Sequence, residues 1–505
     1  MSDPTPSPLW TEVDAADPVG PVGVRGRVRV ALNGELNREG NYVLYWMTSA
    51  RRLHWNHALD RAVAWCVETE RPLVILEALR AGYDFASHRL HRFVMDGMAE
   101  KAEASLPMGV TYLPYVETST GSGAGLLETL MEQAALVVGD DFPTFFLPNM
   151  LAAAAARSPV RFEIVDGNGL LPMGLPGKAY PSAYHFRRFL QKSLPDWLDL
   201  RPEPDPFRGW APRPPATLPE SVDRRWPPAR REQLLSPSFL AGLPIDGEVA
   251  PVPYAGGEES GVGVLDRFLR ERLQRYAQDG NHPDRAAVSA LSPYLHFGHV
   301  SAHQVFAGVS EAEGWTPLRL GEDASGKREG WWGMGESAEA FLEQLVTWRE
   351  LGFNMSRHEP AHREFKSLPA WARATLGEHR EDPRSPEYDR SAFLAAETHD
   401  PVWNAAQREL LATGRIHNYL RMLWGKKILE WSETPEMALA TMIELNDRFA
   451  VDGRDPNSYA GIFWILGRYD RPWPERAVYG KVRSMSSERT RKKVDLEHWL
   501  EEHGS

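Results

Sequence analysis

The sequence has almost no cysteine and no long apolar run. Cys66 is the single cysteine among 505 residues, so an internal disulfide cannot form and a reducing compartment fits. No apolar stretch reaches the roughly 18 residues that span a bilayer. The N-terminus, MSDPTPSP, has no basic region followed by an apolar one, so we expect no signal peptide. These absences predict a cytoplasmic protein without a membrane partner.

The chain also lacks an overall excess of positive charge. Its net charge is −12, which by itself argues against a polyanionic partner. The charge is unevenly distributed, however. Between 471 and 493 only Glu475 and Glu488 oppose eight basic residues, namely Arg471, Arg476, Lys481, Arg483, Arg489, Arg491, Lys492 and Lys493. A local field of this sign can hold a phosphate backbone, but a solvated basic surface has the same composition.

Residues 25–190 follow a polar, proline-rich lead (1–24) that we expect to be disordered. Strand-like segments at 43–47, 72–79, 109–116, 136–138 and 161–165 alternate with helix-like segments at 53–69, 88–105 and 126–135. Strands separated by helices of roughly ten or more residues predict an α/β domain with a Rossmann-like, doubly wound parallel sheet. The GSGAG at 121–125 misses the GxGxxG spacing, because position 126 is Leu, and we interpret it as a glycine-rich connection.

The rest of the chain has a different character. Prolines cluster in 191–255, which prevents long helices and strands there, and we predict an interdomain linker. From 256 to 498 helical periodicity dominates and strand patterns are missing, so we expect an all-α domain. Within it, the stretch 320–335 has the composition of a loop insertion.

Three segments of the helical half have residues suited to chemistry, each with a plainer alternative. SALSP at 289–293 offers small residues and backbone N–H groups at a helix start, which can hold a phosphate or simply cap a helix. Trp424 and Trp431 lie on one helical face, about 10 Å apart along the axis, and could relay electrons or pack a core. The dense polar run at 444–464 indicates a turn that binds a polar ligand.

A fourth segment, FLEQLVTWREL at 341–351, has helical spacing and puts Phe341, Leu345 and Trp348 on one stripe. Gln344 lies one turn before Trp348, so a neutral amide neighbours an indole on the expected buried side of the helix. That amide is either a satisfied core glutamine or part of a site.

Long motifs in these segments resemble the photolyase/cryptochrome family, and most closely its class II cyclobutane pyrimidine dimer photolyases. THDPVWNAAQ (398–407), LWGKKILEW (423–431), LNDRFAVDGRDPN (445–457) and LSPYLHFG (291–298) are similar to the signatures of that class. The similarity is strong over 260–495 and weaker in the α/β part, as in YVLYWM at 42–47. It implies that the helical domain binds FAD in a U-shaped conformation and that light drives dimer splitting in ultraviolet-damaged double-stranded DNA.

The resemblance also implies roles for single residues. Asn446 matches the class II residue that faces flavin N5, where an amide tunes the flavin's electronics. The positions that match FAD contacts are Tyr276, Ser289, Leu291, Ser292, Phe341, Asn418, Arg421, Asn446 and Asp452. The three that match the tryptophan triad, which photoreduces the flavin, are Trp403, Trp424 and Trp431.

In this family the lesion is flipped out of the duplex into a pocket. Trp348 and Trp464 match the aromatic walls of that pocket, and the basic run supplies phosphate contacts. The residues expected to contact DNA are His299, Gln344, Trp348, Trp464, Arg476, Lys481, Arg483 and Arg491.

Four positions depart from the class II pattern. Gln344 stands where the class has Glu, and it can donate a hydrogen bond to the dimer but cannot supply a proton. His299 replaces Gln or Arg, Phe353 replaces Asp, and Asn418 replaces Gly. The leading interpretation is therefore a class II repair enzyme, a deoxyribodipyrimidine photo-lyase, with weakened or retuned chemistry. A cryptochrome-like photoreceptor without repair, and a (6-4) photoproduct lyase with His299 as proton donor, are the alternatives.

The resemblance admits an antenna chromophore, a deazaflavin or a folate, in the α/β domain, and no motif decides between them. It implies no metal. We expect a monomer that associates with the DNA of the nucleoid.

Overall fold

A computed structural model gives the structure of the chain and describes residues 10–13, 19–31 and 34–504. The chain divides into two compact units that alternate along the sequence. The first unit contains the described residues up to Met173 together with Leu194–Gly263 and Pro293–Ala307. The second contains Gly174–Ser193, Val264–Ser292 and the described residues from Gly308 onward.

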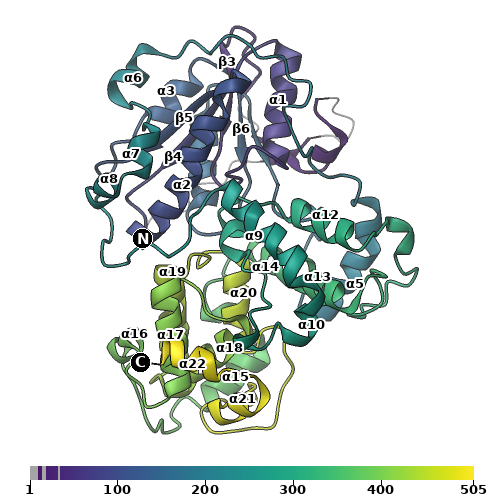
Figure 1. Cartoon of the computed structure of the whole chain (residues 1–505), viewed down its shortest axis with the longest axis vertical. Helices are drawn as coiled ribbons and strands as arrows, with labels where there is room; N and C mark the ends of the chain where they lie inside the picture. Colours follow the sequence, from purple (N-terminus) through teal and green to yellow (C-terminus); the bar gives the residue numbers. More distant parts are fainter. Residues whose placement is uncertain (1–9, 14–18, 32–33, 505) are drawn as a thin grey trace. The chain divides into compact units, whose positions relative to one another are not determined.

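The first unit is built on a seven-stranded sheet with the order β1-β2-β7-β6-β3-β4-β5. Figure 1 labels its strands β3, β4, β5 and β6. Strands β7, β6, β3, β4 and β5 are parallel, whereas β1 and β2 join the β7 edge antiparallel. The chain fills one side of β3 first and then crosses to the other, which makes the sheet doubly wound. The strands are β1 (Trp10–Glu12), β2 (Val28–Ala31), β3 (Tyr42–Trp46), β4 (Leu73–Leu79), β5 (Thr111–Val116), β6 (Ala134–Asp140) and β7 (Phe162–Val165).

Neighbouring side chains of a strand point to opposite sides of a sheet, and helices cover both sides of this one. Tyr42, Leu44 and Trp46 of β3 pack in one cluster with helices α3 (Leu126–Met131) and α4 (Leu147–Arg157). Val43 and Tyr45 pack in the other cluster with α1 (His57–Thr69), on the opposite side of the strands in Figure 1. The remaining helices that lie wholly in this unit are α2 (His88–Ala104), α6 (Glu220–Arg225), α7 (Arg231–Leu235) and α8 (Pro237–Ala241).

The predicted fold class is confirmed, and each predicted strand is present within a few residues of its expected bounds. The differences lie at the boundaries. Residues 10–12 of the expected lead form β1 on the sheet edge, while 1–9 and 14–18 of it lie outside the described residues. The predicted linker 191–255 lies mostly in the first unit, where Trp226 is buried in a sheet-face cluster and donates from Nε1 to the carbonyl of Ser122 at 2.9 Å.

Helices are the main regular structure in the described part of the second unit, which also has one isolated β-bridge, between Arg476 and Gly480. The helices α9 (Glu258–Glu271), α11 (Ser292–His296) and α12 (Ala302–Ala312) contain the points where the chain passes from one unit to the other. The helices wholly in the second unit are α5 (Ala183–Ser193), α10 (Tyr276–Asp279), α13 (Glu336–Leu342), α14 (Arg349–His358), α15 (Ala370–Glu378), α16 (Arg390–Ala395), α17 (Pro401–Thr413), α18 (Asn418–Trp431), α19 (Pro435–Phe449), α20 (Pro456–Ile465), α21 (Ser487–Lys493) and α22 (Glu497–His503). The predicted domain limits, 25–190 and 256–498, assign most of α5 to the α/β domain, whereas the structure places it in the helical unit.

Candidate functional site

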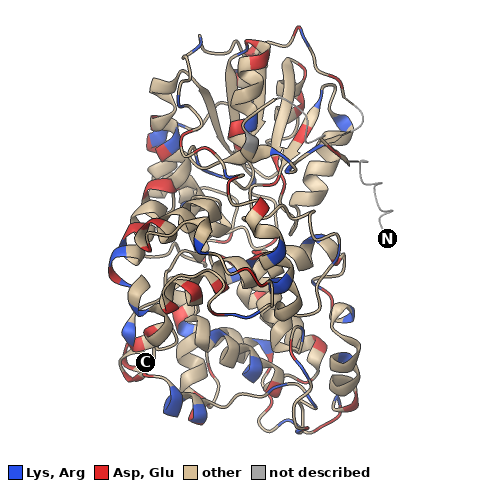
Figure 2. Ribbon diagram, turned by 90° about the vertical axis from the view of Figure 1, so that its right-hand side faces the viewer, with Lys and Arg blue, Asp and Glu red and all other residues tan. Residues whose placement is uncertain are grey.

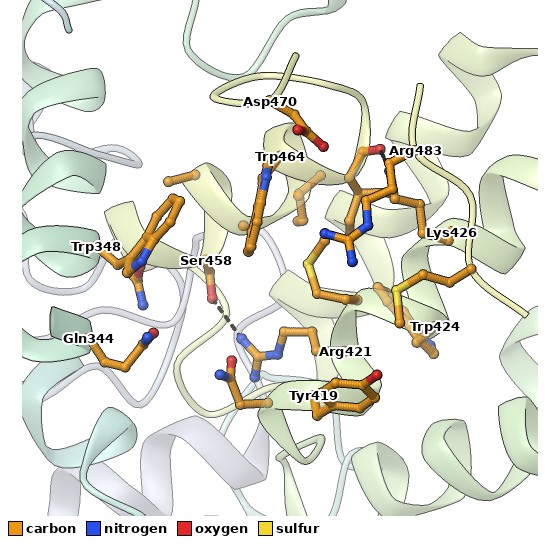
Figure 3. A pocket seen from close by; sticks show the side chains of 18 of the residues that line it. Gln344, Trp348, Tyr419, Arg421, Trp424, Lys426, Ser458, Trp464, Asp470 and Arg483 are labelled. Carbon is orange, nitrogen blue, oxygen red and sulfur yellow. Dashed lines mark hydrogen bonds between the residues drawn. The ribbon is translucent and has the colours of Figure 1, made fainter. Parts of the chain in front are cut away.

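The second unit contains a cavity of about 330 Å³. Its lining comes from the segment between α13 and α14, from α18, α19 and α20, and from the C-terminal segment around Arg483 (Figure 3). A volume of this size lies at the lower end of the range for small-molecule sites, roughly 300–1,000 Å³. Eight residues predicted from the resemblance line it, namely Gln344, Trp348, Asn418, Arg421, Trp424, Asn446, Trp464 and Arg483.

Gln344 and Trp348 lie on a π-helical turn, Glu343–Trp348, between α13 and α14. The backbone N–H of Arg349 bonds to the carbonyl of Gln344, five residues back, as a π-helix requires. Gln344 is exposed while Leu345, Val346 and Thr347 beside it are buried. The expectation of a glutamine on a buried stripe was therefore wrong, because this side chain faces the open cavity (Figure 3).

Glu343 is a second lining residue of this turn, although the 100° step of an α-helix predicts that it points elsewhere. The wider π turn explains part of this difference. Its carboxylate accepts two bonds from the guanidinium of Arg187 on α5, one of them from Nε at 2.9 Å. Both side chains of this pair are about nine-tenths buried. Because Arg187 engages both carboxylate oxygens, Glu343 has no oxygen left to replace the missing acid at Gln344.

Trp348 and Trp464 form one aromatic surface in the cavity. Their rings stack with centroids 4.8 Å apart and an interplanar angle of 25°. Both indoles are half-buried and accessible from the cavity (Figure 3). They stack on each other rather than stand apart, so a base would lie against this pair and not between its members.

Arg421 on α18 lines the cavity. Its guanidinium bonds Ser458 at 3.3 Å (Figure 3) and Asp452 at 3.3 Å. Ser458 donates in turn to the backbone carbonyl of Asp452 at 2.9 Å. These contacts join the first turn of α18 to the first turn of α20. They present a cation that is fixed from two sides and only partly neutralised, which suits a ligand ring that becomes anionic.

Asn446 on α19 also lines the cavity, and its orientation is determined by its neighbours. The amide nitrogen donates to the carbonyl of Gly453 and to Asp447 Oδ1 at 3.3 Å. Because both partners are acceptors, the amide cannot be flipped, and its oxygen is the atom left for a ligand. Asp447 is fully buried, accepts from the Tyr459 hydroxyl at 2.8 Å, and burial raises its pKa to about 6.

The three tryptophans of the expected triad follow one another away from the cavity. Trp424 lines it, and its backbone carbonyl accepts from Nε1 of Trp403 at 2.9 Å. Trp403 in turn contacts Trp431, with ring centroids 6.1 Å apart. All three indoles are buried, at 2%, 0% and 3% exposure in that order. Sequence spacing predicts that Trp424 and Trp431 share a helix face. The structure adds that Trp403 contacts both of them.

The residues expected at the FAD phosphates lie in other parts of the same unit. Tyr276 on α10 packs against Phe341, at 5.4 Å between centroids, and Phe341 is buried in this aromatic cluster. The Ser289 hydroxyl accepts from the N–H of Leu291 at 3.4 Å, and Ser292 begins α11. These contacts hold a turn of small residues just before α11. That this turn binds the FAD phosphates stays a prediction.

All eight basic residues of the run 471–493 are exposed. Figure 2 shows acidic and basic residues interspersed over the ribbon, so this run is a local feature of an acidic chain. Arg483 lines the cavity and lies over the Trp473 ring at 5.0 Å. Arg476, Lys481 and Arg491 are solvent-facing, where phosphate contacts would be made.

Two of the predicted departures lie inside the protein. His299 is completely buried in the first unit, where its Nδ1 accepts from the N–H of Gly257 at 2.9 Å and its ring stacks on Phe93. Burial also lowers its pKa well below the ordinary range. The expectation that His299 contacts the lesion is not met, because no face of its ring is open. Phe353 is buried beneath the guanidinium of Arg349.

The residues that sequence reasoning missed are Arg187, Lys426 and Ser458. Lys426 lines the cavity beside Trp424, donates to the carbonyl of Ile465, and burial lowers its pKa to about 7. The pair of lysines inside the apolar LWGKKILEW was a usable signal, since one of two consecutive residues on a core helix must face inward. No comparable signal marks Arg187.

No protein-family model matches the chain. The chain is 32% identical over 485 residues to a deoxyribodipyrimidine photo-lyase of Methanothermobacter thermautotrophicus, covering 93% of this chain and 96% of the relative. The chain belongs to the deoxyribodipyrimidine photo-lyase family. Photo-lyases of Oryza sativa (32%, 94% of this chain and 89% of the relative) and Potorous tridactylus (30%, 93% and 83%) are also similar.

The photo-lyase fold is also seen among solved structures. A class III photolyase from Agrobacterium tumefaciens matches with a TM-score of 0.65 over 94% of this chain and 88% of that one. At 18% identity this match shows the fold alone.

Membership of the photo-lyase family implies that the protein binds FAD. The residues that line the cavity fit the ring system of a flavin. The fixed oxygen of Asn446 can accept from a ring N–H, and the Arg421–Asp452 pair can lie against a ring that gains charge. Among the described residues no cluster of three or more metal-ligating side chains occurs. No described helix is long and apolar enough to cross a membrane.

Proposed function

We propose that this photo-lyase uses light to split cyclobutane pyrimidine dimers in DNA, in the manner of class II enzymes. One observation carries the proposal: a single cavity joins an aromatic surface, Trp348 with Trp464, to the guanidinium of Arg421 and the fixed amide of Asn446. Outside the lining, Asp452 pairs with that guanidinium. Such a cavity can hold a redox-active ring and a flipped base together. Reduced FAD, when bound, supplies the electron that opens the cyclobutane ring.

The chain's own residues then have separate tasks. Asn446 and Arg421 hold the flavin ring, while Trp348 and Trp464 offer an apolar face on which the flipped dimer stacks. Trp424, Trp403 and Trp431 lead electrons to the cavity from the far side. Tyr276, Ser289, Leu291, Ser292 and Asn418 are proposed as further FAD contacts. The exposed basic run binds the phosphates on either side of the lesion, so DNA affinity falls with salt.

Gln344 determines how well the dimer chemistry works. Its exposed amide can donate a hydrogen bond from Nε2 to a carbonyl oxygen of the dimer, which stabilises charge that develops there. An amide N–H is far too weak an acid to transfer its proton, so any step that depends on acid catalysis is slower than with a carboxylic acid. The expected outcome is repair that is retained but retuned.

A photoreceptor without repair is the second candidate function. It is favoured by a different observation, the lack of an available acid on the π turn: Gln344 is an amide, and Glu343 beside it is bound in an ion pair with Arg187. The (6-4) lyase alternative loses its support, since it needed His299 as a proton donor and that ring is completely buried.

The first unit offers a place for an antenna chromophore. A second cavity, of about 290 Å³, lies at the carboxyl ends of β3, β4 and β5 and includes the glycine-rich connection 121–125. Trp46 and Tyr115 supply flat surfaces in it. We propose that a deazaflavin or folate would bind there.

A repair assay on two matched oligonucleotides tests the proposal. The FAD-loaded protein is photoreduced and given one oligonucleotide with a single cyclobutane dimer and another with a single (6-4) photoproduct, in blue light and in the dark. We expect light-dependent loss of the cyclobutane dimer only. Gln344→Glu should accelerate that loss, and an unchanged rate would show that the retuning lies elsewhere. An intact dimer with wild type, but binding of damaged DNA and photoreduction preserved, would favour the photoreceptor.

A further inference from the structure

The loop before α13 carries a basic side chain to the cavity, and the proposed function has given it no task. This loop is the stretch 320–335, whose composition predicts an insertion. Arg328 in it lines the cavity together with Glu343 and Gln344 of the π turn. Its side chain is 66% exposed, so the guanidinium lies where the cavity opens to solvent and can meet a ligand that enters.

We infer that Arg328 contacts the flipped pyrimidine dimer and stabilises the negative charge that the dimer gains during repair. The inference deepens the proposed function and rests on it, because it needs a dimer in the cavity. In the class II pattern a glutamate at position 344 has this task. Here Gln344 and a cation of the loop share it.

The backbone just before Arg328 is held against α5. The side-chain amide of Gln191 accepts from the N–H of Gly326 at 2.7 Å and donates to the carbonyl of Lys327 at 2.8 Å. Arg187 donates to the carbonyl of Gly326 at 2.9 Å. Gly326 has a φ of 78°, a conformation that favours glycine. Because these contacts fix the backbone that leads into Arg328, little backbone freedom is lost when its side chain binds a ligand.

The part of the loop that follows is anchored as well. Trp331 and Trp332 are buried, and the carbonyl of Trp332 accepts from Nε1 of Trp315 at 2.6 Å. The N–H of Gly330 donates to the carboxylate of Glu339 on α13. The loop therefore presents its exposed guanidinium from a backbone that is held on both sides.

The charges beside Gln344 do not cancel. Arg187 engages both oxygens of the Glu343 carboxylate, one of them through Nε at 2.9 Å. The Arg328 Nε lies 3.9 Å from Oε1 of the same carboxylate, which is beyond hydrogen-bond distance. One carboxylate therefore faces two guanidinium groups, and one positive charge remains in excess. An ionised glutamate at position 344 would cancel this excess, whereas the amide of Gln344 leaves it available to an anion.

A cation in this place suits the reaction. The dimer takes up one electron, so its carbonyl oxygens become more negative than in the ground state. A guanidinium offers several N–H donors in one plane and stays protonated in proteins. Arg328 therefore attracts the added charge without transferring a proton, and it is unchanged when the electron leaves the opened ring. A group that stabilises the charged dimer keeps the electron there longer, which favours ring opening over premature return of the electron.

The number of dimers split per absorbed photon, measured at saturating DNA, tests the inference. The FAD-loaded protein is photoreduced and given an oligonucleotide with a single cyclobutane dimer in blue light. Arg328→Gln should lower this yield several-fold, and Arg328→Lys, which keeps the charge, should restore most of it. Lys327→Gln is the matched control, because Lys327 is the neighbouring exposed cation of the loop and lies outside the cavity lining. Its yield should equal that of the wild type.

A phosphate contact would give a different pattern. If Arg328 binds only the DNA backbone, Arg328→Gln weakens the binding of damaged DNA, reduces the salt slope of that binding by about one, and leaves the yield at saturation unchanged. That pattern would overturn the inference. Melting temperature and FAD affinity should be the same for Arg328→Gln and the wild type, because the side chain is exposed. A loss of either would assign Arg328 a structural role instead.

A double variant tests the link to Gln344. Arg328→Gln should cost less yield in Gln344→Glu protein than in the wild type, because the glutamate then takes over part of the task. Equal costs in both backgrounds would show that the two side chains act separately, against the shared task. A wild type that splits dimers with a yield insensitive to Arg328→Gln would overturn the inference alone. A wild type that splits no dimer would contradict the proposed function, and the inference with it.

Discussion

Replacing Glu343 by Gln tests whether the π turn of the cavity is held by a buried ion pair. The change keeps the shape of the side chain and removes its charge. Arg187 then stays buried without its anion, retaining a bond to the carbonyl of Gly326 at 2.9 Å. Breaking one partner of a buried pair costs about 3–5 kcal/mol, and the side-chain exposures of 8% and 10% place this pair in that class.

The expected shift in melting temperature follows from the size of the helical unit. For a unit of about 250 residues, each kcal/mol lowers the melting temperature by roughly 2–4 °C, so Glu343→Gln should lower it by about 10 °C. Calorimetry of the full chain measures this directly. Glu436→Gln is the control, because its pair with Arg380 has the same chemistry but is more than two-fifths exposed, and about 0–1 kcal/mol is expected.

A double variant separates the ion pair from simple packing. Arg187→Met with Glu343→Met removes both buried charges, and it should recover most of the lost stability. A melting temperature for Glu343→Gln within about 2 °C of the wild type would refute the reasoning, since it would mean that the pair is well solvated. So would a double variant as unstable as the single one.

Three further predictions concern the same cavity. Between the folded Lys426 pKa of about 7 and the ordinary value of 10.5, the unfolded chain binds one more proton than the folded one, so the wild type should gain about 3–5 kcal/mol of stability from pH 7 to 10. Lys426→Met should abolish this gain, which urea unfolding at several pH values measures. Trp403→Phe should reduce flavin photoreduction at least tenfold while FAD binding, followed by absorbance, is unchanged, since the middle of the series is lost. Gly453→Ala should weaken FAD binding, because a Cβ there would lie 2.2 Å from the carbonyl oxygen of Asn446; unchanged FAD affinity would count against the role of Asn446.

The sequence predicted well what short-range patterns determine. The strands of the sheet follow from apolar runs between helices, and the relation of Trp424 to Trp431 follows from helical spacing. Family motifs brought Arg421, Asn446 and Trp464 to one cavity, where the structure also finds them.

Contacts between residues far apart in the sequence could not be predicted from short-range patterns. Arg187 and Glu343 are 156 residues apart, and no local pattern pairs them. The exposure of Gln344 depends on a π turn, which periodicity arguments treat as an ordinary helix. The burial of His299 depends on Gly257 and Phe93, whose closeness only the tertiary structure determines.

The most direct test of the central claim is the number of cyclobutane dimers split per photon by the photoreduced protein on a defined oligonucleotide. We expect splitting that requires both light and reduced flavin and that falls when Trp348 is replaced by Ala. Dimers that remain intact under continued blue light, in a sample whose flavin is reduced and whose DNA is bound, would contradict it.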